Sequence, residues 1–118
     1  MATIQKTLVL GEVGEAEAII RFTGTELVEL RDVQVVADEI EEIAYNHPIK
    51  VLVLNCANLR RMTSAFLSRM VSLNKAMRQA GISMRVCGMS PDIDHAFRIC
   101  RLEKIIPVFA GEDEALRA

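Results

Sequence analysis

The sequence predicts an α/β fold in which a mixed, mostly parallel β-sheet carries about four helices and begins with an antiparallel hairpin. Strand-like runs alternate with segments whose apolar residues recur every three or four positions, the pattern of strands joined by crossover helices. The run Val51–Leu54 is apolar without interruption, which is typical of a strand buried on both faces. The length of 118 residues suits one domain, which is expected to span residues 1–118.

The N-terminal part of the chain predicts two strands and a helix. Ile4–Glu12 and Ala16–Thr23 have strand-like content, and the glycine-containing turn at residues 13–15 favours a β-hairpin between them. Asp32 is expected as the N-cap of a helix that ends near His47-Pro48. The apolar face of this helix follows helical spacing and consists of Val33, Val36, Ala37, Ile40, Ile43 and Ala44.

The middle of the chain predicts a strand, a loop and a second helix. After the strand Val51–Leu54, the segment Cys56–Met62 is expected to be a loop, and a helix then runs from about Thr63 to Ala80. Gly81 supplies the C-terminal stop, because glycine adopts the left-handed conformation at little cost. The apolar face of this helix is formed by Phe66, Leu67, Met70, Val71, Leu73 and Met77.

The C-terminal part predicts two further strands and two helices. Ser83–Gly88 alternates as a strand does, and Ser90-Pro91 combines a serine N-cap with a proline at the first helical position. Ile105–Phe109 is expected as a last short strand. Gly111–Ala118 is expected as a terminal helix whose first turn is acidic, as the helix dipole favours. The third helix would bury Ile93, Ala96, Phe97 and Cys100.

The cysteines indicate a reducing compartment, and the apolar runs are too short for a membrane span. Cys56, Cys87 and Cys100 are odd in number and widely spaced, so neither a disulfide framework nor a zinc site is expected. All three are interpreted as inert core thiols. The N-terminus does not resemble a signal peptide, and no apolar run approaches the length of a membrane span. We therefore expect a cytoplasmic protein that does not bind a membrane.

Few residues are suited to catalysis, and the protein is not expected to be an enzyme. His47 and His95 are isolated and are interpreted as surface residues. Asp92 and Asp94 are explained as partners of a helix dipole. Gly-rich phosphate loops and the GxSxG and HExxH motifs are missing, so no cofactor, metal ion or catalytic residue is predicted. The chain has one Tyr, four Phe and no Trp, too few side chains for base stacking, so no nucleic-acid partner is expected.

The net charge of −2 conceals an uneven distribution of charge. Glu26–Asn46 carries seven acids and one base, whereas Val51–Ser90 contains no Asp or Glu. Solvated helix faces explain this pattern simply. A partner that docks on the second segment is nevertheless expected to present an acidic surface. The bases of that segment are Arg60, Arg61, Arg69, Lys75, Arg78 and Arg85.

Hydroxyl side chains gather at the start of the second helix, just after the strand Val51–Leu54. Sites in open parallel sheets form at the carboxyl ends of strands, so this is a favoured place for function. Thr63 or Ser64 serves as an N-cap in the simplest interpretation. In a second interpretation the segment is a phosphorylation switch. A phosphate here would meet free backbone N–H groups, yet it would add about two negative charges to a surface that a partner touches.

Three stretches of the chain, Val51–Ser68, Gln79–Pro91 and Phe97–Phe109, together resemble the STAS domain. This is the domain of bacterial anti-sigma-factor antagonists, and it is also found in sulfate transporters. The shared pattern is a buried strand, a hydroxyl-rich helix start, a glycine before the next strand, a Ser-Pro helix start and an apolar strand near an acidic end. The resemblance covers about residues 16–118 and implies a STAS-like fold.

The resemblance also implies a phosphoacceptor. In the antagonists the helix start usually reads Asp-Ser-Ser-Gly, and a partner anti-sigma kinase phosphorylates the first serine. Thr63 takes the place of the aspartate, Ser64 that of the phosphorylated serine, Ala65 that of the second serine and Phe66 that of the glycine. Only Ser64 is retained. Phe66 is expected to add bulk where a partner approaches closely.

These patterns lead to the expectation of a protein-binding signalling module. The resemblance implies an anti-sigma factor of the serine-kinase type as partner, and Ser64 as phosphoacceptor with Thr63 as the alternative. A monomer or a weak homodimer is expected. The expected contact surface is the loop Cys56–Met62 and the exposed face of the second helix, including Arg60, Arg61, Ser64, Ser68 and Arg69.

Two alternatives stay open. One is a STAS scaffold or oligomerisation module that is never phosphorylated, which the departures at Thr63 and Phe66 favour. The other is a sensor of a small ligand or nucleotide that uses the same crevice.

Overall fold

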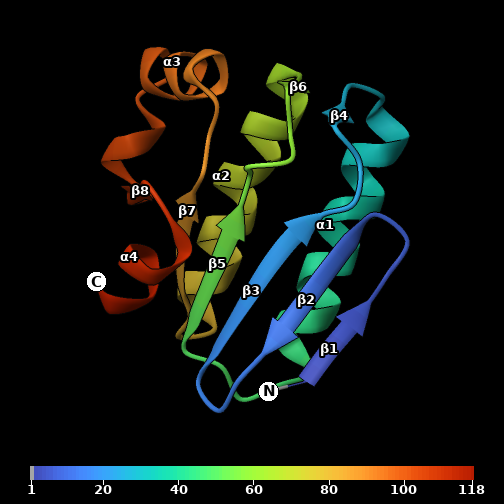
Figure 1. Cartoon of the computed structure of the whole chain (residues 1–118), viewed down its shortest axis with the longest axis vertical. Helices are drawn as coiled ribbons and strands as arrows, with labels where there is room; N and C mark the ends of the chain where they lie inside the picture. The colour runs from blue at the N-terminus through green and yellow to red at the C-terminus, as the bar shows by residue number, and fades with distance from the viewer. Residues whose placement is uncertain (1) are drawn as a thin grey trace.

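Strands and helices alternate along the chain in the computed structural model, which describes residues 2–118 (Figure 1). This order confirms the predicted α/β fold. The strands are β1 Ala2–Gln5, β2 Val9–Val13, β3 Glu17–Phe22, β4 Glu26–Leu27, β5 Val51–Asn55, β6 Arg61–Met62, β7 Ser83–Cys87 and β8 Val108–Phe109. The helices are α1 Leu30–Tyr45, α2 Ser64–Gln79, α3 Pro91–Ile99, the 3₁₀ turn η1 Leu102–Lys104 and α4 Glu112–Arg117.

The main sheet has the strand order β1-β2-β3-β5-β7-β8. Strand β2 runs antiparallel to its neighbours β1 and β3, and β3, β5, β7 and β8 are parallel. The predicted antiparallel hairpin and mostly parallel sheet are therefore confirmed. Leu52, Val53 and Leu54 of β5 are fully buried, as the unbroken apolar run predicts for a central strand.

Helices cover the two faces of the sheet unequally. The apolar stripes of α1 and α2 pack on one face and form the larger core. The short helix α4 covers the other face, where Ala115 packs on Ile19, Val53 and Cys87 (Figure 1). The side chain of Arg85 holds α4 in place through a 2.6 Å hydrogen bond from Nη1 to the carbonyl oxygen of Ala115. No helix within residues 2–118 combines the length and the apolar composition needed to cross a membrane.

Two predictions for the N-terminal part are wrong in detail. The expected strand Ile4–Glu12 is two strands, because the chain turns at residues 6–8 and the backbone N–H groups of Thr7 and Leu8 donate to the Glu39 carboxylate at 2.8 Å. The N-cap of α1 is Glu29 rather than Asp32. The helix begins earlier because the N–H of Val33 already donates to the carbonyl of Glu29 at 3.1 Å.

The C-terminal strand is shorter than predicted. The N–H groups of Ile105 and Ile106 donate to the carbonyl of Leu102, which closes η1 and leaves only Val108–Phe109 to pair with β7. The predicted N-cap of α3 and the predicted glycine stop of α2 are both confirmed. Ser90 caps α3 through a 3.3 Å bond from the N–H of Ile93, and Gly81 follows α2 with a φ of 77°.

Two residues expected in the core are exposed. Val71 of α2 is 37% exposed, because the helix buries a narrower stripe than its apolar composition suggests. Cys100 lies at the exposed C-cap of α3, so it is not a core thiol. Cys56 and Cys87 are buried as expected, and burial raises their thiol pKa values to about 12 and about 11.

Candidate functional site

The predicted site lies where the carboxyl ends of the parallel strands meet the start of α2. The loop expected at Cys56–Met62 contains a two-residue strand, β6, which pairs in parallel with β4. Figure 1 shows β4, β6 and the first turns of α1 and α2 at the same end of the sheet. We call this region the β4–β6 surface; its exposed residues are Glu26, Val28, Leu30, Arg60, Arg61, Ser64 and Ser68.

Backbone hydrogen bonds hold the two loops of this surface together. The N–H groups of Arg60 and Arg61 donate to the carbonyl of Thr25, and the N–H of Thr63 donates to that of Leu27 at 3.0 Å. The side-chain amide of Asn58 also donates two 3.0 Å hydrogen bonds, to the carbonyl oxygens of Phe22 and Gly24. The start of α2 is thereby fixed to the chain that enters α1.

The first turn of α2 separates the two candidate phosphoacceptors. Thr63 is the N-cap with extended backbone, but its side chain makes no capping bond and its Oγ1 is buried without a hydrogen-bond partner in the part of the chain described. Ser64 is the first helical residue, and its side chain is exposed. No acid stands in this first turn, so the positive end of the helix dipole has no compensating side chain there.

The arginines of the predicted site have different surroundings. Arg61 lies 3.7 Å from the Glu26 carboxylate, and both side chains are exposed, so this pair adds less than about 1 kcal/mol to stability. Arg60 is exposed and forms no ion pair within residues 2–118, whereas Arg69 is half-buried. Ser68 lies one turn after Ser64 on the same exposed face of α2.

Phe66 does not obstruct the surface. Its side chain is 1% exposed and packs edge-on against Phe22, with the ring centroids 6.0 Å apart. The expectation that Phe66 adds bulk to the contact surface is therefore wrong. The ring points into the core, because position 66 falls on the buried stripe of α2 together with Met70.

Two apolar residues of the surface were missed from the sequence. Val28, which directly follows β4, is 38% exposed, and Leu30, the first residue of α1, is 73% exposed. The parallel pairing of β4 with β6 brings them next to the start of α2. Their only signal in the sequence is that two apolar residues precede the periodic part of α1.

In the neighbouring crevice beside β3 and β5, polar side chains are already hydrogen-bonded to other residues of the protein. A cavity of about 420 Å³ lies there, lined in part by Arg21, Asn55 and Asn58. Arg21 makes two 2.8 Å bonds to Glu112 and one bond to Glu12, and Asn55 donates to Glu112 at 2.6 Å. The bonds from Arg21 lower the pKa of the Glu112 carboxyl. These partners leave few polar groups free for a small ligand.

The histidines lie apart from this surface. His95 is exposed on α3, and His47 is half-buried after α1 with its Nδ1 2.7 Å from the carbonyl oxygen of Ile43. Within residues 2–118, no three His, Cys, Asp or Glu side chains are grouped so that they could hold a metal ion.

Comparison with known proteins identifies the family. The model of the STAS domain matches residues 15–115. An anti-sigma factor antagonist from Mycobacterium paratuberculosis superimposes with a TM-score of 0.79 at 16% identity, over 92% of this chain and 90% of that chain. A STAS domain protein from Planctomyces limnophilus, also described as an anti-sigma-factor antagonist, gives 0.79 at 15% identity, over 92% and 94%.

A third structure is a phosphorylated protein. The Bacillus cell fate determinant SpoIIAA in its phosphorylated form gives a TM-score of 0.68 at 18% identity, over 92% of this chain and 96% of that chain. At such identities these likenesses show a shared fold. Together with the family match over most of the sequence, they establish that the chain belongs to the STAS family and resembles its anti-sigma-factor antagonists.

Proposed function

We propose that this STAS domain is a non-catalytic protein-binding switch whose β4–β6 surface contacts an anti-sigma factor of the serine-kinase type. Arg60, Arg61, Ser64, Ser68 and Arg69 would contribute from the loop and α2. In this proposal the domain acts in the cytoplasm as a monomer or weak homodimer and needs no cofactor. The resemblance to anti-sigma-factor antagonists supports the class of partner.

One observation carries the switch: the exposed Ser64 hydroxyl stands at the first position of a helix whose first turn lacks an acid. A phosphate on Ser64 would lie beside free backbone N–H groups at the positive end of the dipole. Thr63 is less suitable, because its Oγ1 is buried and its side chain would have to leave the core first. Ser64 is therefore proposed as the phosphoacceptor, and Thr63 as the weaker alternative.

The proposed switch acts on the partner and not on the fold. A phosphoserine brings about two negative charges to a surface that also exposes Val28 and Leu30. An unpaired charge desolvated at an interface costs several kcal/mol. Phosphorylation is thus expected to release the partner while the domain stays folded. Association with the partner is also expected to slow as salt rises, because Arg60 and Arg61 are exposed charges.

The test compares three variants of the full chain. Ser64→Asp should keep the melting temperature near that of the wild type and lower the affinity for the partner by about a hundredfold or more. Ser64→Ala should bind as the wild type does and resist phosphorylation. Partner capture from the host extract with mass spectrometry, phosphosite mapping and titration calorimetry supply the readouts.

Thr63→Val is the matched control, since it removes the neighbouring hydroxyl without adding charge. It should leave both binding and phosphorylation of Ser64 intact. Phosphate on Thr63 alone would move the switch by one residue. Equal affinity of the wild type and Ser64→Asp, with no phosphate on either residue, would overturn the switch and favour an unphosphorylated scaffold.

A further inference from the structure

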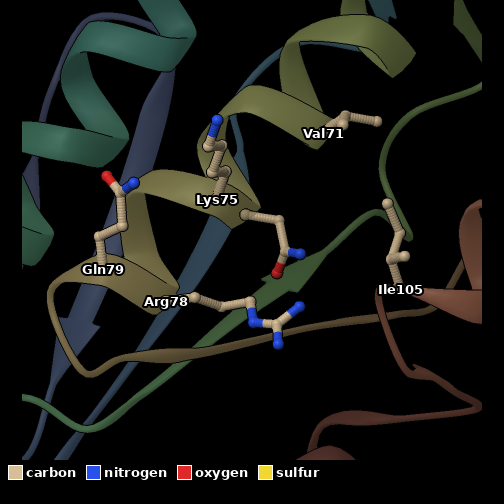
Figure 2. Close-up of a pocket in the computed structure, with 6 residues that line it drawn as sticks. Val71, Lys75, Arg78, Gln79 and Ile105 are labelled. Atoms are coloured by element: carbon tan, nitrogen blue, oxygen red, sulfur yellow. The ribbon is translucent and has the colours of Figure 1, made fainter.

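A trough follows the C-terminal half of α2, beside the segment after η1 (Figure 2). Two adjacent cavities of about 500 and 370 Å³ share Asn74, Arg78 and Ile105 in their linings, and together we call them the α2–Ile105 trough. Figure 2 shows Val71 and Ile105 extending toward one another from its two walls, and Arg78 extending from the last turn of α2. Both apolar side chains are exposed, at 37% and 42%.

Polar side chains of the trough have no partners within the described part of the protein. Asn74 is only 4% exposed, lines both cavities and takes part in no side-chain hydrogen bond with another residue of 2–118. Lys75 and Arg78 are exposed and form no ion pair in the same range. A buried amide beside two unpaired cations calls for a ligand with hydrogen-bonding and acidic groups.

The floor of the trough includes Met84 of β7, which is 2% exposed and is not paired by β8. Along β7 the backbone groups of successive residues point alternately toward β5 and toward β8. The N–H of Ser83 donates to the carbonyl of Lys50 on the β5 side, and the N–H of Val86 donates to the carbonyl of Pro107 on the β8 side. The backbone of Met84 therefore faces the β8 side, where pairing begins only at Val86. Pro107 has no N–H to offer, so the ladder cannot extend to Met84.

We propose that the α2–Ile105 trough is a peptide-binding site that takes an extended acidic and apolar segment of a partner protein. Helix α2 rises by about 12 Å from Val71 to Gln79, which an extended chain spans with about four residues. The backbone of the peptide pairs with Met84 and the Asn74 amide. Its acidic side chains bind Lys75 and Arg78, and an apolar side chain fits between Val71 and Ile105.

The combination of groups favours a peptide over a small anion. A free carboxylate would meet the two cations and leave both Met84 and Asn74 unpaired. Main-chain pairing at a free sheet edge combined with side-chain pockets is a recurring mode of peptide recognition. The α2 and β7 sides of the trough are free of acids, since Val51–Ser90 contains no Asp or Glu, whereas Glu103 stands two residues before Ile105 on the other side.

This site is separate from the proposed switch. Ser64 and Arg78 lie at opposite ends of α2, about 20 Å apart along its axis. The two sites therefore make independent predictions, and a partner with a globular part and an acidic tail would occupy both.

The experiment titrates the ¹⁵N-labelled full chain with the acetylated and amidated peptide Glu-Asp-Leu-Asp-Glu, recorded by NMR. The backbone amide of Met84, the side-chain amide of Asn74 and the amide of Ile105 should shift together. Arg78→Glu should weaken binding by about tenfold or more, because a favourable charge pair becomes a repulsive one. The peptide N-methylated at its central residue should also bind more weakly, since it cannot donate to the strand edge.

Matched controls separate this proposal from the others. Arg117→Glu reverses an exposed charge on α4, outside the trough, and should keep the affinity of the wild type. The proposal is overturned if the neutral peptide Gln-Asn-Leu-Asn-Gln binds equally well, if glutarate alone causes the same shifts, or if the shifts fall on the β4–β6 surface. Absence of any shift at millimolar peptide overturns it as well.

Discussion

Helices α2 and α3 both follow a strand of the parallel sheet, yet their first turns differ in almost every respect. The start of α3 is complete in itself: Ser90 caps it, Pro91 fits its first position, and Asp92 and Asp94 face its positive end. The start of α2 has no capping bond and no acid in its first turn, and the hydroxyl of Thr63 is buried without a partner in the described structure.

The difference separates a helix start that is complete in itself from one that, in our proposal, accepts a phosphate. At α3 the dipole and the N–H groups are satisfied by residues of the chain itself, so an added anion would gain little. At α2 the same requirements are unmet beside an exposed serine. A phosphate on Ser64 would supply the negative charge that the first turn of α2 lacks. It would thereby compensate the positive end of the helix dipole.

The largest expected effect concerns the bend that leads into α3. Gly88 has a φ of 70°, and a Cβ added there would lie 2.7 Å from Asn55 Oδ1. Gly88→Ala should therefore cost about 3 kcal/mol from left-handed strain and the clash together. Gly81→Ala is the matched control: its φ is 77°, but nothing lies within 4 Å of the added Cβ, so about 1 kcal/mol is expected. Urea unfolding measures both, and equal losses would contradict this account.

A smaller loss of stability is expected when Glu112, an acid in the first turn of α4, can no longer pair with Arg21 of β3. Glu112→Gln should cost about 2 kcal/mol at neutral pH, because it removes the charge paired with Arg21. Since the folded-state pKa of Glu112 is lowered, its contribution is present at neutral pH and is lost as pH falls through that pKa. The stability difference between wild type and Glu112→Gln should therefore shrink as unfolding is measured from about pH 7 down to about pH 3. A pH-independent difference would assign the loss to packing.

The smallest effects compare the two caps directly and should have opposite signs. Ser90→Ala removes the bond to the N–H of Ile93 and should destabilise by about 1 kcal/mol. Thr63→Val removes a buried hydroxyl without a partner and should stabilise by a similar amount, about 1 kcal/mol. Calorimetry should show the melting temperatures moving apart, each by about 4 °C from that of the wild type. Destabilisation by Thr63→Val would mean that its hydroxyl is satisfied in solution.

Features set by local residue order could be predicted from the sequence. The uninterrupted apolar run Val51–Leu54 predicted β5, and the serine N-cap followed by proline at Ser90-Pro91 predicted the start of α3. Strands β4 and β6 could not be predicted. Each has two residues, and they exist only because distant loops meet, so no periodicity can develop along the chain.

The candidate site was predictable in place but not in detail. The hydroxyl-rich helix start pointed to Thr63 and Ser64, but only the tertiary structure distinguishes a buried Oγ1 from an exposed one. Leu30 was missed because its exposure results from where α1 begins, three residues before Val33, the first residue of the buried apolar stripe. The helical spacing correctly placed Phe66 on the apolar face of α2, and only the alignment with a glycine suggested that it adds bulk to the contact surface.

The pairing of Arg21 with Glu112 also orders events during synthesis of the protein. The two residues lie 91 positions apart, so a ribosome working at about 5–20 residues per second needs roughly 5–20 s to deliver the second after the first. Once β5 has emerged, β3 and β5 can form with Ile19 and Val53 uncovered, because α4 is made later. The nascent domain thus exposes an apolar strip on its sheet until its last helix arrives.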